Sequence, residues 1–325
     1  MDEYRIARDK GGGYLQNSLR DDGGFGDPNK GAIEYYKVPT ALLVCGKTEA
    51  ASRLLGWIRR DGTTLEGDFV PRPDDHQNSY FYAYHNIWII MAAQRMGQFD
   101  LSRNGMGFIL DFWDPASGGF YSSPSERTEH TLQDLWVVSG CGIAALYTGM
   151  LEVAEGVGYW MKRLMSLQPE YPQKLYTVYS RSHGLYTPEN PVDEFRYVLD
   201  SNSNRDQSFY HPGIAGGFLA RLYQATGNSE WLTLSKEYMR LPELATDHLW
   251  SLLRAGKVGW CASILYTLTG DECYKDMAIR VGNNLIATQT EEGYWTIDGS
   301  DTPSNDTTAE MVVWLDEIYQ SVGRK

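Results

Sequence analysis

Six segments of the chain share one pattern, an apolar stretch that stops at a glycine. The final glycines are Gly46, Gly97, Gly149, Gly227, Gly270 and Gly323. Apolar residues around most of the circumference are typical of a helix buried on several sides, and glycine can take the left-handed conformation that ends a helix. The intervals of 51, 52, 78, 43 and 53 residues each fit one helical hairpin with its loops. The sequence therefore predicts an all-α protein with six inner helices.

A second set of segments lies between these stretches and carries its charges on one face, as expected of outer helices. They are residues 48–60, 100–113, 150–168, 229–241 and 272–289, with 11–20 as the end of a sixth. Six inner and six outer helices in alternation can stack into an open array or close into a ring. An open array needs polar terminal caps, but the first and last helices here are as apolar as the others. We therefore expect a single (α/α)6 barrel domain over residues 1–325.

Several outer segments lead into a turn that combines glycine with an aromatic residue. These turns lie at residues 21–26, 65–69, 116–121 and 291–295. Glycine supplies the unusual backbone angles of a tight turn. We expect the aromatic ring to fill the layer between the helices.

The connections from outer to inner helices are long, whereas those from inner to outer helices are short. The long ones span residues 61–79, 114–129, 168–205 and 290–305. Binding and catalytic residues concentrate on long loops of a rigid scaffold. The sequence therefore predicts a functional site at the N-terminal ends of the inner helices.

Polar and aromatic side chains gather at those helix ends. The candidate catalytic residues are Asp306, His211, His85 and Asp134, and the candidate substrate-binding residues are Tyr36, Tyr84, Tyr210, Trp260 and Glu310. Imidazole and carboxylate groups in one cavity can exchange protons near neutral pH. Aromatic rings suit either sugars or hydrophobic substrates.

Some of these residues also have a purely structural interpretation. Asp306, Glu129 and Asp206 are alternatively helix caps, because acidic side chains can satisfy free backbone amides, and for Asp206 we prefer this interpretation. His85 is equally well a hydrogen-bonded core histidine. His211 lies where its helix begins, so we expect it to be exposed to the cavity.

Composition limits the partners. A net charge of −13 without lysine–arginine runs argues against nucleic acid and anionic membranes. The charged start and the lack of long apolar runs predict a soluble, cytoplasmic protein. The four cysteines lie far apart, which argues against a zinc site or a disulfide framework. No phosphate-binding or dinucleotide-binding motif occurs, so we expect a small-molecule substrate, no cofactor and no metal, with the aspartate pairs at 21–22 and 74–75 as weak cation candidates. The oligomeric state is left open.

Three motifs resemble those of a known superfamily. Residues 289–295 ("QTEEGYW") resemble the Gln-x-x-x-Gly-x-Trp repeat of squalene and oxidosqualene cyclases, and residues 16–26 ("QNSLRDDGGFG") resemble the repeat of protein prenyltransferase β subunits. Residues 306–310 ("DTTAE") are similar to the acid motif of triterpene cyclases, which implies that Asp306 is a general acid. The chain has room for one such domain where a triterpene cyclase has two, and the prenyltransferase zinc ligands have no clear counterpart.

The resemblance implies a toroid of helices. That fold is also similar to linalool dehydratase-isomerase, the N-acylglucosamine 2-epimerases and sugar-cleaving (α/α)6 enzymes. The leading hypothesis is a cofactor-independent cyclase, dehydratase or isomerase that acts on a hydrophobic terpenoid or polyketide by acid-base catalysis in the barrel cavity. The alternative is a carbohydrate-active hydrolase, lyase or epimerase of the same fold. A non-catalytic scaffold is the third hypothesis.

Overall fold

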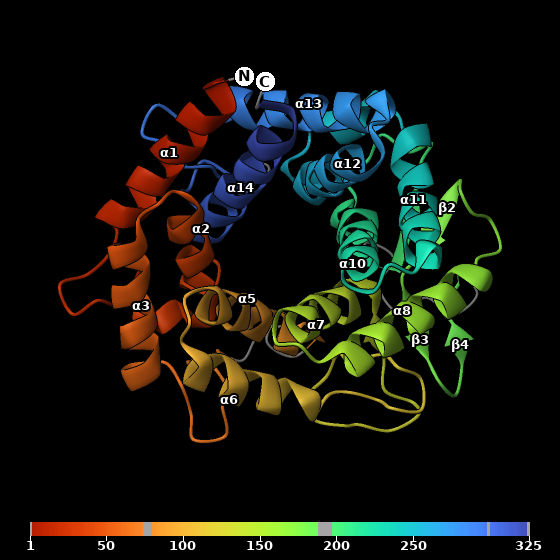
Figure 1. Ribbon diagram of the computed structural model, residues 1–325, viewed down its shortest axis with the longest axis horizontal. Helices are drawn as coiled ribbons and strands as arrows, with labels where there is room; N and C mark the ends of the chain where they lie inside the picture. Colours follow the sequence, from red (N-terminus) through yellow and green to blue (C-terminus); the bar gives the residue numbers. More distant parts are fainter. Residues whose placement is uncertain (1, 74–79, 188–196, 298–299, 324–325) are drawn as a thin grey trace. The chain divides into compact units, whose positions relative to one another are not determined.

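The computed structural model describes residues 2–73, 80–187, 197–297 and 300–323. Its elements are mostly α-helices joined by loops of unequal length (Figure 1). Packing separates a first unit, Met1–Asp111 with Leu285–Lys325, from a second unit, Phe112–Asn284. The single domain expected over residues 1–325 stays a prediction. Within the described ranges, no helix is both long and apolar enough to cross a membrane.

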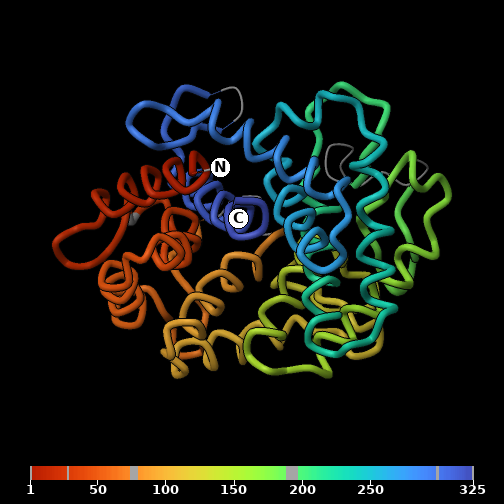
Figure 2. The backbone as a smooth tube through the Cα atoms, turned by 45° about the horizontal axis from the view of Figure 1, so that its top comes forward, coloured from red at the N-terminus to blue at the C-terminus, as the bar shows by residue number. Residues whose placement is uncertain are grey.

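The first unit alternates outer and inner helices. In chain order they are α1 (Asp2–Asn17), α2 (Val38–Val44), α3 (Thr48–Asp61), α5 (Tyr82–Arg95), α6 (Phe99–Leu110) and α14 (Asn305–Ile318). Helix α14 contacts both α1 and α2. Arg8 of α1 donates a 2.5 Å hydrogen bond to Asp316 of α14, and Figure 2 shows the red and blue ends of the chain side by side. The first and last helices of the chain therefore pack together within the first unit.

The second unit is centred on α10 (Tyr210–Thr226). This helix contacts α7 (Leu135–Tyr147), α8 (Leu151–Ser166), α11 (Ser229–Leu244) and α12 (Gly256–Thr269), and α13 (Glu272–Ala287) follows them in the chain. A Cβ at Gly213 would lie 2.3 Å from the backbone of Lys257, and one at Gly217 would lie 2.2 Å from the Trp260 ring. The close contact of α10 with α12 therefore depends on residues that have no side chain.

Burial separates inner from outer helices as the sequence predicts. Every residue of α5 from Ala83 to Ala93 is buried, whereas α3 exposes a face that includes Arg59 and Arg60. Five of the predicted terminal glycines are confirmed by φ angles between +70° and +79°: Gly46, Gly97, Gly149, Gly227 and Gly270. The prediction is wrong for Gly323, because the chain after α14 continues as a π-helical turn, Tyr319–Gly323.

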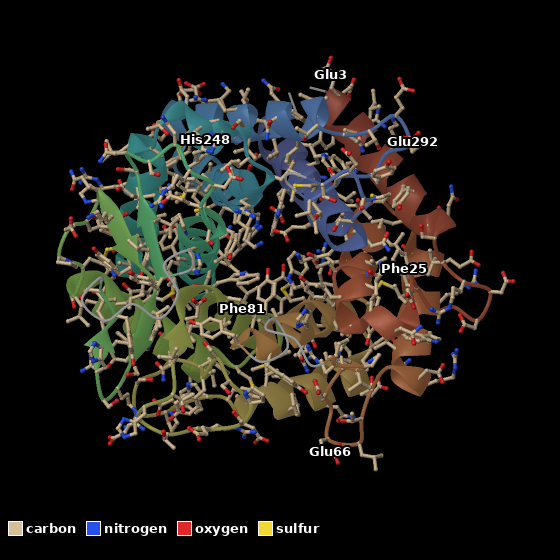
Figure 3. The ribbon with its side chains drawn as sticks, turned by 180° about the vertical axis from the view of Figure 1, so that it is seen from behind. Glu3, Phe25, Glu66, Phe81, His248 and Glu292 are labelled. Atoms are coloured by element: carbon tan, nitrogen blue, oxygen red, sulfur yellow. The ribbon has the colours of Figure 1, made fainter. Side chains whose placement is uncertain are left out.

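The glycine–aromatic turns are confirmed as structural plugs. Their fully buried rings are Phe25, Phe69, Phe120 and Trp295. Figure 3 shows Phe25 inside its unit, whereas Glu66 and Glu292, at the tips of two such turns, lie at the outside.

Each turn also docks on the backbone of a neighbouring outer helix. A Cβ at Gly67 would lie 2.2 Å from the carbonyl oxygen of Asn104 in α6, and one at Gly118 would lie 2.3 Å from that of Gly156 in α8. Both turn glycines have positive φ angles, +94° and +83°. Glycine is therefore required twice over, by backbone conformation and by the closeness of the next helix.

Short antiparallel strands lie in the long connection after α8, apart from β1, which directly precedes α7. Strand β3 (Val178–Ser180) pairs with β1 (Gln133–Asp134) and β4 (Gly184–Leu185), and β2 (Lys174–Tyr176) pairs with β5 (Val198–Asp200). Asp134 stands opposite Val178 in this register. The strand pairing thus fixes the backbone from which α7 begins.

Candidate functional site

A buried lysine organises one polar cluster of the first unit. Lys37 immediately precedes α2, and its Nζ lies 2.8 Å from Asp306 Oδ1 and also contacts Glu310. Burial alone would lower the pKa of Lys37, but the carboxylates of Asp306 and Glu310 outweigh it and hold that pKa well above its ordinary value. Lys37 is therefore a fixed cation and not an amine nucleophile. The side chains of Asp306 and Glu310 are 31% and 13% exposed, so the cluster reaches solvent on their side.

The helix-cap interpretation of Asp306 is wrong. Ser304 caps α14 instead, because its hydroxyl accepts a 3.1 Å hydrogen bond from the amide of Thr307. A single cap at Ser304 leaves the carboxylate of Asp306 available for Lys37.

Asp206 and Glu129 cap no helix either. The Asp206 carboxylate lies 3.0 Å from Nε2 of His248, and Glu129 lies 3.7 Å from the ring of His130. Helix α7 is capped by Asp134. Both cap predictions fail because the helices begin several residues later than the sequence pattern indicated.

His85 lies in the first turn of α5, beside the Lys37 cluster. Its ring centroid is 4.7 Å from that of Tyr36, and Lys37 Nζ is 4.9 Å from the centre of the same tyrosine ring. Burial lowers the pKa of His85 well below its ordinary value, the charges of Arg72 and Lys37 act in the same direction, and a backbone contact with Tyr82 opposes them weakly. Among the described residues, Nδ1 of His85 has no hydrogen-bond partner of ordinary geometry. His85 is thus a neutral imidazole near a fixed cation.

Tyr36 and Tyr84 form the aromatic side of this cluster, with ring centroids 6.2 Å apart. Burial, followed by the Asp306 carboxylate, raises the pKa of Tyr36 well above its ordinary value, so its hydroxyl stays protonated. The first unit therefore holds five of the predicted site residues: Tyr36, Tyr84, His85, Asp306 and Glu310. Lys37 stands at the start of an inner helix like these candidates, and the structure shows that it joins two of them, Asp306 and Glu310.

A second polar group precedes α5 and surrounds the turn residue Asp68. The Asp68 carboxylate accepts hydrogen bonds from Phe69 N (2.8 Å), Asn86 Nδ2 (3.0 Å), Arg72 Nη2 (3.0 Å) and Tyr82 Oη (2.5 Å). Burial and the bond to Asp68 raise the pKa of Tyr82 to about 12. Nε and Nη1 of Arg72 have no hydrogen-bond partner within the described ranges, although this side chain is only 7% exposed. Sequence reasoning missed both residues; the acid that follows the turn glycine could have identified Asp68.

The second unit pairs Asp134 with His211. Asp134 Oδ1 accepts a 2.8 Å hydrogen bond from the amide of Trp136 and lies 3.4 Å from Nε2 of His211. His211 Nδ1 is 3.0 Å from the carbonyl oxygen of Ser208. A carbonyl can only accept, so Nδ1 carries the hydrogen and Nε2 is the atom left for proton exchange. The expected exposure of His211 is wrong, because both it and Asp134 are fully buried by their own helices and neighbours.

Aromatic rings adjoin this pair. The ring of Tyr210 lies 4.8 Å from that of His211 and 4.7 Å from that of Trp136. Lys257 Nζ lies 5.6 Å from the centre of the Tyr210 ring. Trp260 packs against α10, which accounts for its burial. The substrate-binding roles of Tyr210 and Trp260, like the catalytic roles of Asp134 and His211, stay predictions.

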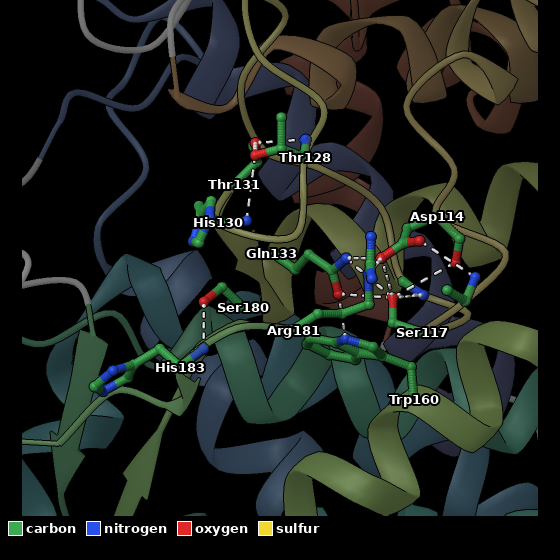
Figure 4. Close-up of polar contacts among 12 residues, drawn as sticks. Asp114, Ser117, Thr128, His130, Thr131, Gln133, Trp160, Ser180, Arg181 and His183 are labelled. Carbon is green, nitrogen blue, oxygen red and sulfur yellow. Dashed lines mark hydrogen bonds and ion pairs between the residues drawn. The ribbon is translucent and has the colours of Figure 1, made fainter.

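A closed polar network, drawn in Figure 4, stands next to the start of α7. Gln133 Nε2 donates to Asp114 Oδ2 (3.0 Å), and Gln133 Oε1 accepts from Trp160 Nε1 (2.6 Å) and Ser117 Oγ (3.0 Å). Arg181 Nε donates to Asp114 at 2.7 Å. The buried amide is fully used within the network, which is the arrangement expected of a structural support.

Among the described residues, no three His, Cys, Asp or Glu side chains are grouped as metal ligands. The Asp21–Asp22 pair lies in an exposed turn where Asp22 bonds Arg20, and the pair at 74–75 falls outside the described ranges. The four cysteines are free thiols: Cys45, Cys141, Cys261 and Cys273.

Comparison with known proteins finds similarity in structure only. Neither a protein-family model nor a curated protein matches the sequence. A D-mannose isomerase matches with a TM-score of 0.72 and 14% identity, covering 98% of this chain and 97% of that chain. The GH76A α-1,6-mannanase from Salegentibacter sp. HEL1_6 matches with a TM-score of 0.66 and 14% identity, covering 98% and 99%. An unsaturated glucuronyl hydrolase specific for heparin matches with a TM-score of 0.64 and 11% identity, covering 99% of each chain.

These matches give the fold class. The chain has the (α/α)6 barrel fold, as the sequence predicts. Identities of 11% to 14% establish the fold and no activity.

The resemblance to terpenoid cyclases and prenyltransferases is wrong, and so is the expected biosynthetic cyclase acting on a terpenoid or polyketide. The three similar structures given above are a mannose isomerase, a mannanase and a glucuronyl hydrolase, all named for sugars. The motifs that carried the resemblance have a packing explanation. Gln289 donates to the carbonyl oxygens of Ala7 and Gly293 at 2.9 and 3.0 Å, and Trp295 Nε1 donates to that of Leu285 at 2.9 Å. The "QTEEGYW" turn thus packs within the first unit, against the backbone of α1 and its own flanking residues.

Proposed function

We propose that this protein is a carbohydrate-active enzyme that shifts a proton on a sugar, in the manner of a sugar isomerase or epimerase. The observation that carries the proposal is the combination of carboxylate, neutral imidazole and ammonium in the first unit, at Asp306, His85 and Lys37. Sugar-processing proteins on the same fold support it.

Each of these groups has a role in a proton shift next to a carbonyl. The Asp306 carboxylate, which is partly exposed, takes the proton from the carbon beside the sugar carbonyl. The electron pair moves onto the carbonyl oxygen, and the resulting enediolate is stabilised by the Lys37 ammonium. A neutral imidazole at His85 donates a hydrogen bond to that oxygen, a task for which a lowered pKa is suited. For an isomerisation, the hydroxyl proton moves from the neighbouring oxygen to the former carbonyl oxygen, and the abstracted proton returns to the former carbonyl carbon. For an epimerisation, a proton returns to the original carbon on its opposite face and the carbonyl forms again.

Hydrolysis fits the cluster less well. A glycosidase needs one carboxylic acid to protonate the leaving group and a second carboxylate on the other side of the bond. Asp306 and Glu310 both contact the same ammonium of Lys37. Neither stands alone in the apolar surroundings that keep a general acid protonated.

The test is hydrogen exchange in heavy water. The protein is incubated with D-mannose, D-glucose and the matching uronic acids, and proton NMR follows the signal of the hydrogen beside the carbonyl. We expect that signal to disappear as deuterium enters and a second sugar forms. Release of reducing ends from α-1,6-mannan oligosaccharides without exchange would instead establish a hydrolase, and no reaction on either panel would refute the proposal.

Variants assign the roles. Asp306→Asn should lower the exchange rate by about 10²-fold to 10⁴-fold, the usual contribution of a general base. His85→Gln should lower it less, because glutamine still donates a hydrogen bond. His211→Gln is the matched comparison in the second unit. A larger loss in His211→Gln than in Asp306→Asn, at unchanged melting temperature, would move the chemistry to the Asp134–His211 pair.

A further inference from the structure

We infer that Arg72 binds a carboxylate of the substrate, so that the sugar on which this protein acts is a sugar acid and not a neutral hexose. The assignment of the ligand as a sugar rests on the proposed function. The anion site itself rests on Arg72 and its neighbours alone.

The guanidinium of Arg72 is held firmly at one end. Its Nη2 donates to Asp68 at 3.0 Å and also bonds the side-chain oxygen of Asn86. Its carbon lies 4.5 Å from the centre of the Tyr82 ring, so the flat group is supported on a face. A guanidinium fixed in this way has little conformational freedom left, so a ligand that binds it loses little affinity to ordering the side chain.

The other end of the same group is unused. Nε and Nη1 have no hydrogen-bond partner among the described parts of the chain, and the side chain is only 7% exposed. Buried donors without acceptors are rare in folded proteins, because each one costs the free energy of its lost water. An oxygen ligand that accepts from Nε and Nη1 would remove this cost.

Charge favours a carboxylate as that ligand. The Asp68 carboxylate accepts from three neutral donors, Phe69 N, Tyr82 Oη and Asn86 Nδ2. It therefore bonds only one nitrogen of Arg72, Nη2. Arginine recognises carboxylates through several N–H groups at once. Among the charged neighbours of His85, Arg72 is the one that lowers its pKa most, so the positive potential of the guanidinium extends to the proposed site.

A phosphate fits less well than a carboxylate. Asp68, Asp306 and Glu310 already place three negative charges around the two cations Lys37 and Arg72. A dianion would add two more, whereas a carboxylate adds one. Nε and Nη1 of Arg72 therefore match one carboxylate, which carries a single negative charge.

The first experiment changes the ligand and leaves the protein intact. Isothermal titration compares D-glucuronate with D-glucose, D-mannuronate with D-mannose, and D-glucuronate with its neutral amide, D-glucuronamide. We expect each uronate to bind about tenfold or more tightly than its neutral counterpart, the factor given by one charge-assisted contact. Equal or tighter binding of the neutral sugars would overturn the inference, as would tighter binding of D-glucose 6-phosphate than of the uronates.

The second experiment changes the protein. Arg72→Gln should lower uronate affinity about tenfold or more and leave the affinity for neutral sugars unchanged, while Arg72→Lys should keep part of the preference. Arg181→Gln is the matched control, because Arg181 also pairs with a turn aspartate, Asp114, but is 31% exposed. An equal loss for charged and neutral sugars in Arg72→Gln would show a structural role only and overturn the inference. The ligand comparison decides the matter if Arg72→Gln does not fold.

Binding and turnover separate the two proposals. Uronates that bind through Arg72 without hydrogen exchange would refute the proton shift and keep the anion site. Exchange on neutral sugars with no uronate preference would do the reverse.

Discussion

Two turns with the same backbone pattern lead into α5 and α7. Each contains a glycine that docks on an outer helix, a buried phenylalanine, and an aspartate that accepts from a side-chain amide near the start of the following helix, although Asp68 follows its turn glycine and Asp114 precedes its own. Asp68 meets Asn86 in the first turn, and Asp114 meets Gln133 in the second. An arginine joins each aspartate.

The turns differ in what the remaining donors do. Around Asp114 the amide of Gln133 is consumed by Ser117 and Trp160, and Arg181 is partly exposed to water. Around Asp68, Arg72 keeps two buried nitrogens that have no partner among the residues the structure describes. A repeated structural unit can therefore serve as support in one copy and as a candidate ligand site in another, and the pairing of buried donors tells them apart.

The largest expected effect concerns what the turns share. Gly67→Ala and Gly118→Ala should each reduce the free energy of unfolding by about 4 kcal/mol, because a methyl group would overlap a carbonyl oxygen and the backbone has positive φ. Urea unfolding measures it. Gly46→Ala, where φ is +71° but no atom lies within 4 Å of the added Cβ, should cost only about 1 kcal/mol. Similar losses in all three variants would mean that docking on the next helix contributes nothing.

A middle-sized effect separates support from recognition. Gln133→Met should destabilise the fold by about 2 to 3 kcal/mol, because it leaves the buried Trp160 Nε1 without its acceptor and removes one of the donors to Asp114. Thermal and urea unfolding give this number, and sugar-acid affinity should be unchanged. If Gln133→Met weakened sugar-acid binding as much as Arg72→Gln does, the two turns would not differ in function, and the prediction would be contradicted.

The smallest expected effect is a pH dependence of stability that comes from His85, whose charged neighbours include Arg72 of the Asp68 turn. The folded-state pKa of His85 is lowered, so below about pH 6.5 the unfolded chain binds a proton that the folded chain does not. The free energy of unfolding should therefore fall as pH drops, by up to about 1.4 kcal/mol per pH unit, and this part should vanish in His85→Gln. Urea midpoints near about pH 7.5 and about pH 5.5 measure it. The exposed His130, changed to Gln, is the control, and an identical pH slope in wild type and His85→Gln would contradict the prediction.

Much of the fold follows from local patterns. Apolar stretches such as the one in α5 mark inner helices because a helix buried on all sides has no polar face, and a glycine after the last turn marks its end. The fully buried Phe69 and Trp295 were anticipated from the glycines before them. Gly323 was mistaken because the same residue type also fits a π-helical turn.

Less of the candidate site than of the fold could be predicted from the sequence. Five candidates at the starts of inner helices do lie in one unit, since helix polarity places those ends together. Three helix-cap assignments failed, because a cap is decided by which of several nearby polar residues reaches the free amides, as Ser304 does in place of Asp306. The terpenoid resemblance failed for a related reason: turns that pack rings between helices use similar residues whatever the substrate.

The sequence by itself determined that this protein is an alternation of buried and amphipathic helices with long connections from outer to inner helices, because hydrophobic periodicity and glycine positions are local properties of the chain. Only the tertiary structure decided which charges meet. Lys37 is joined to Asp306 and Glu310 from the far end of the chain, and Arg72 is anchored through Nη2 while its Nε and Nη1 lack partners in the described part of the chain. Such pairings depend on burial and on distances of a few ångströms between distant segments, and no local pattern records them.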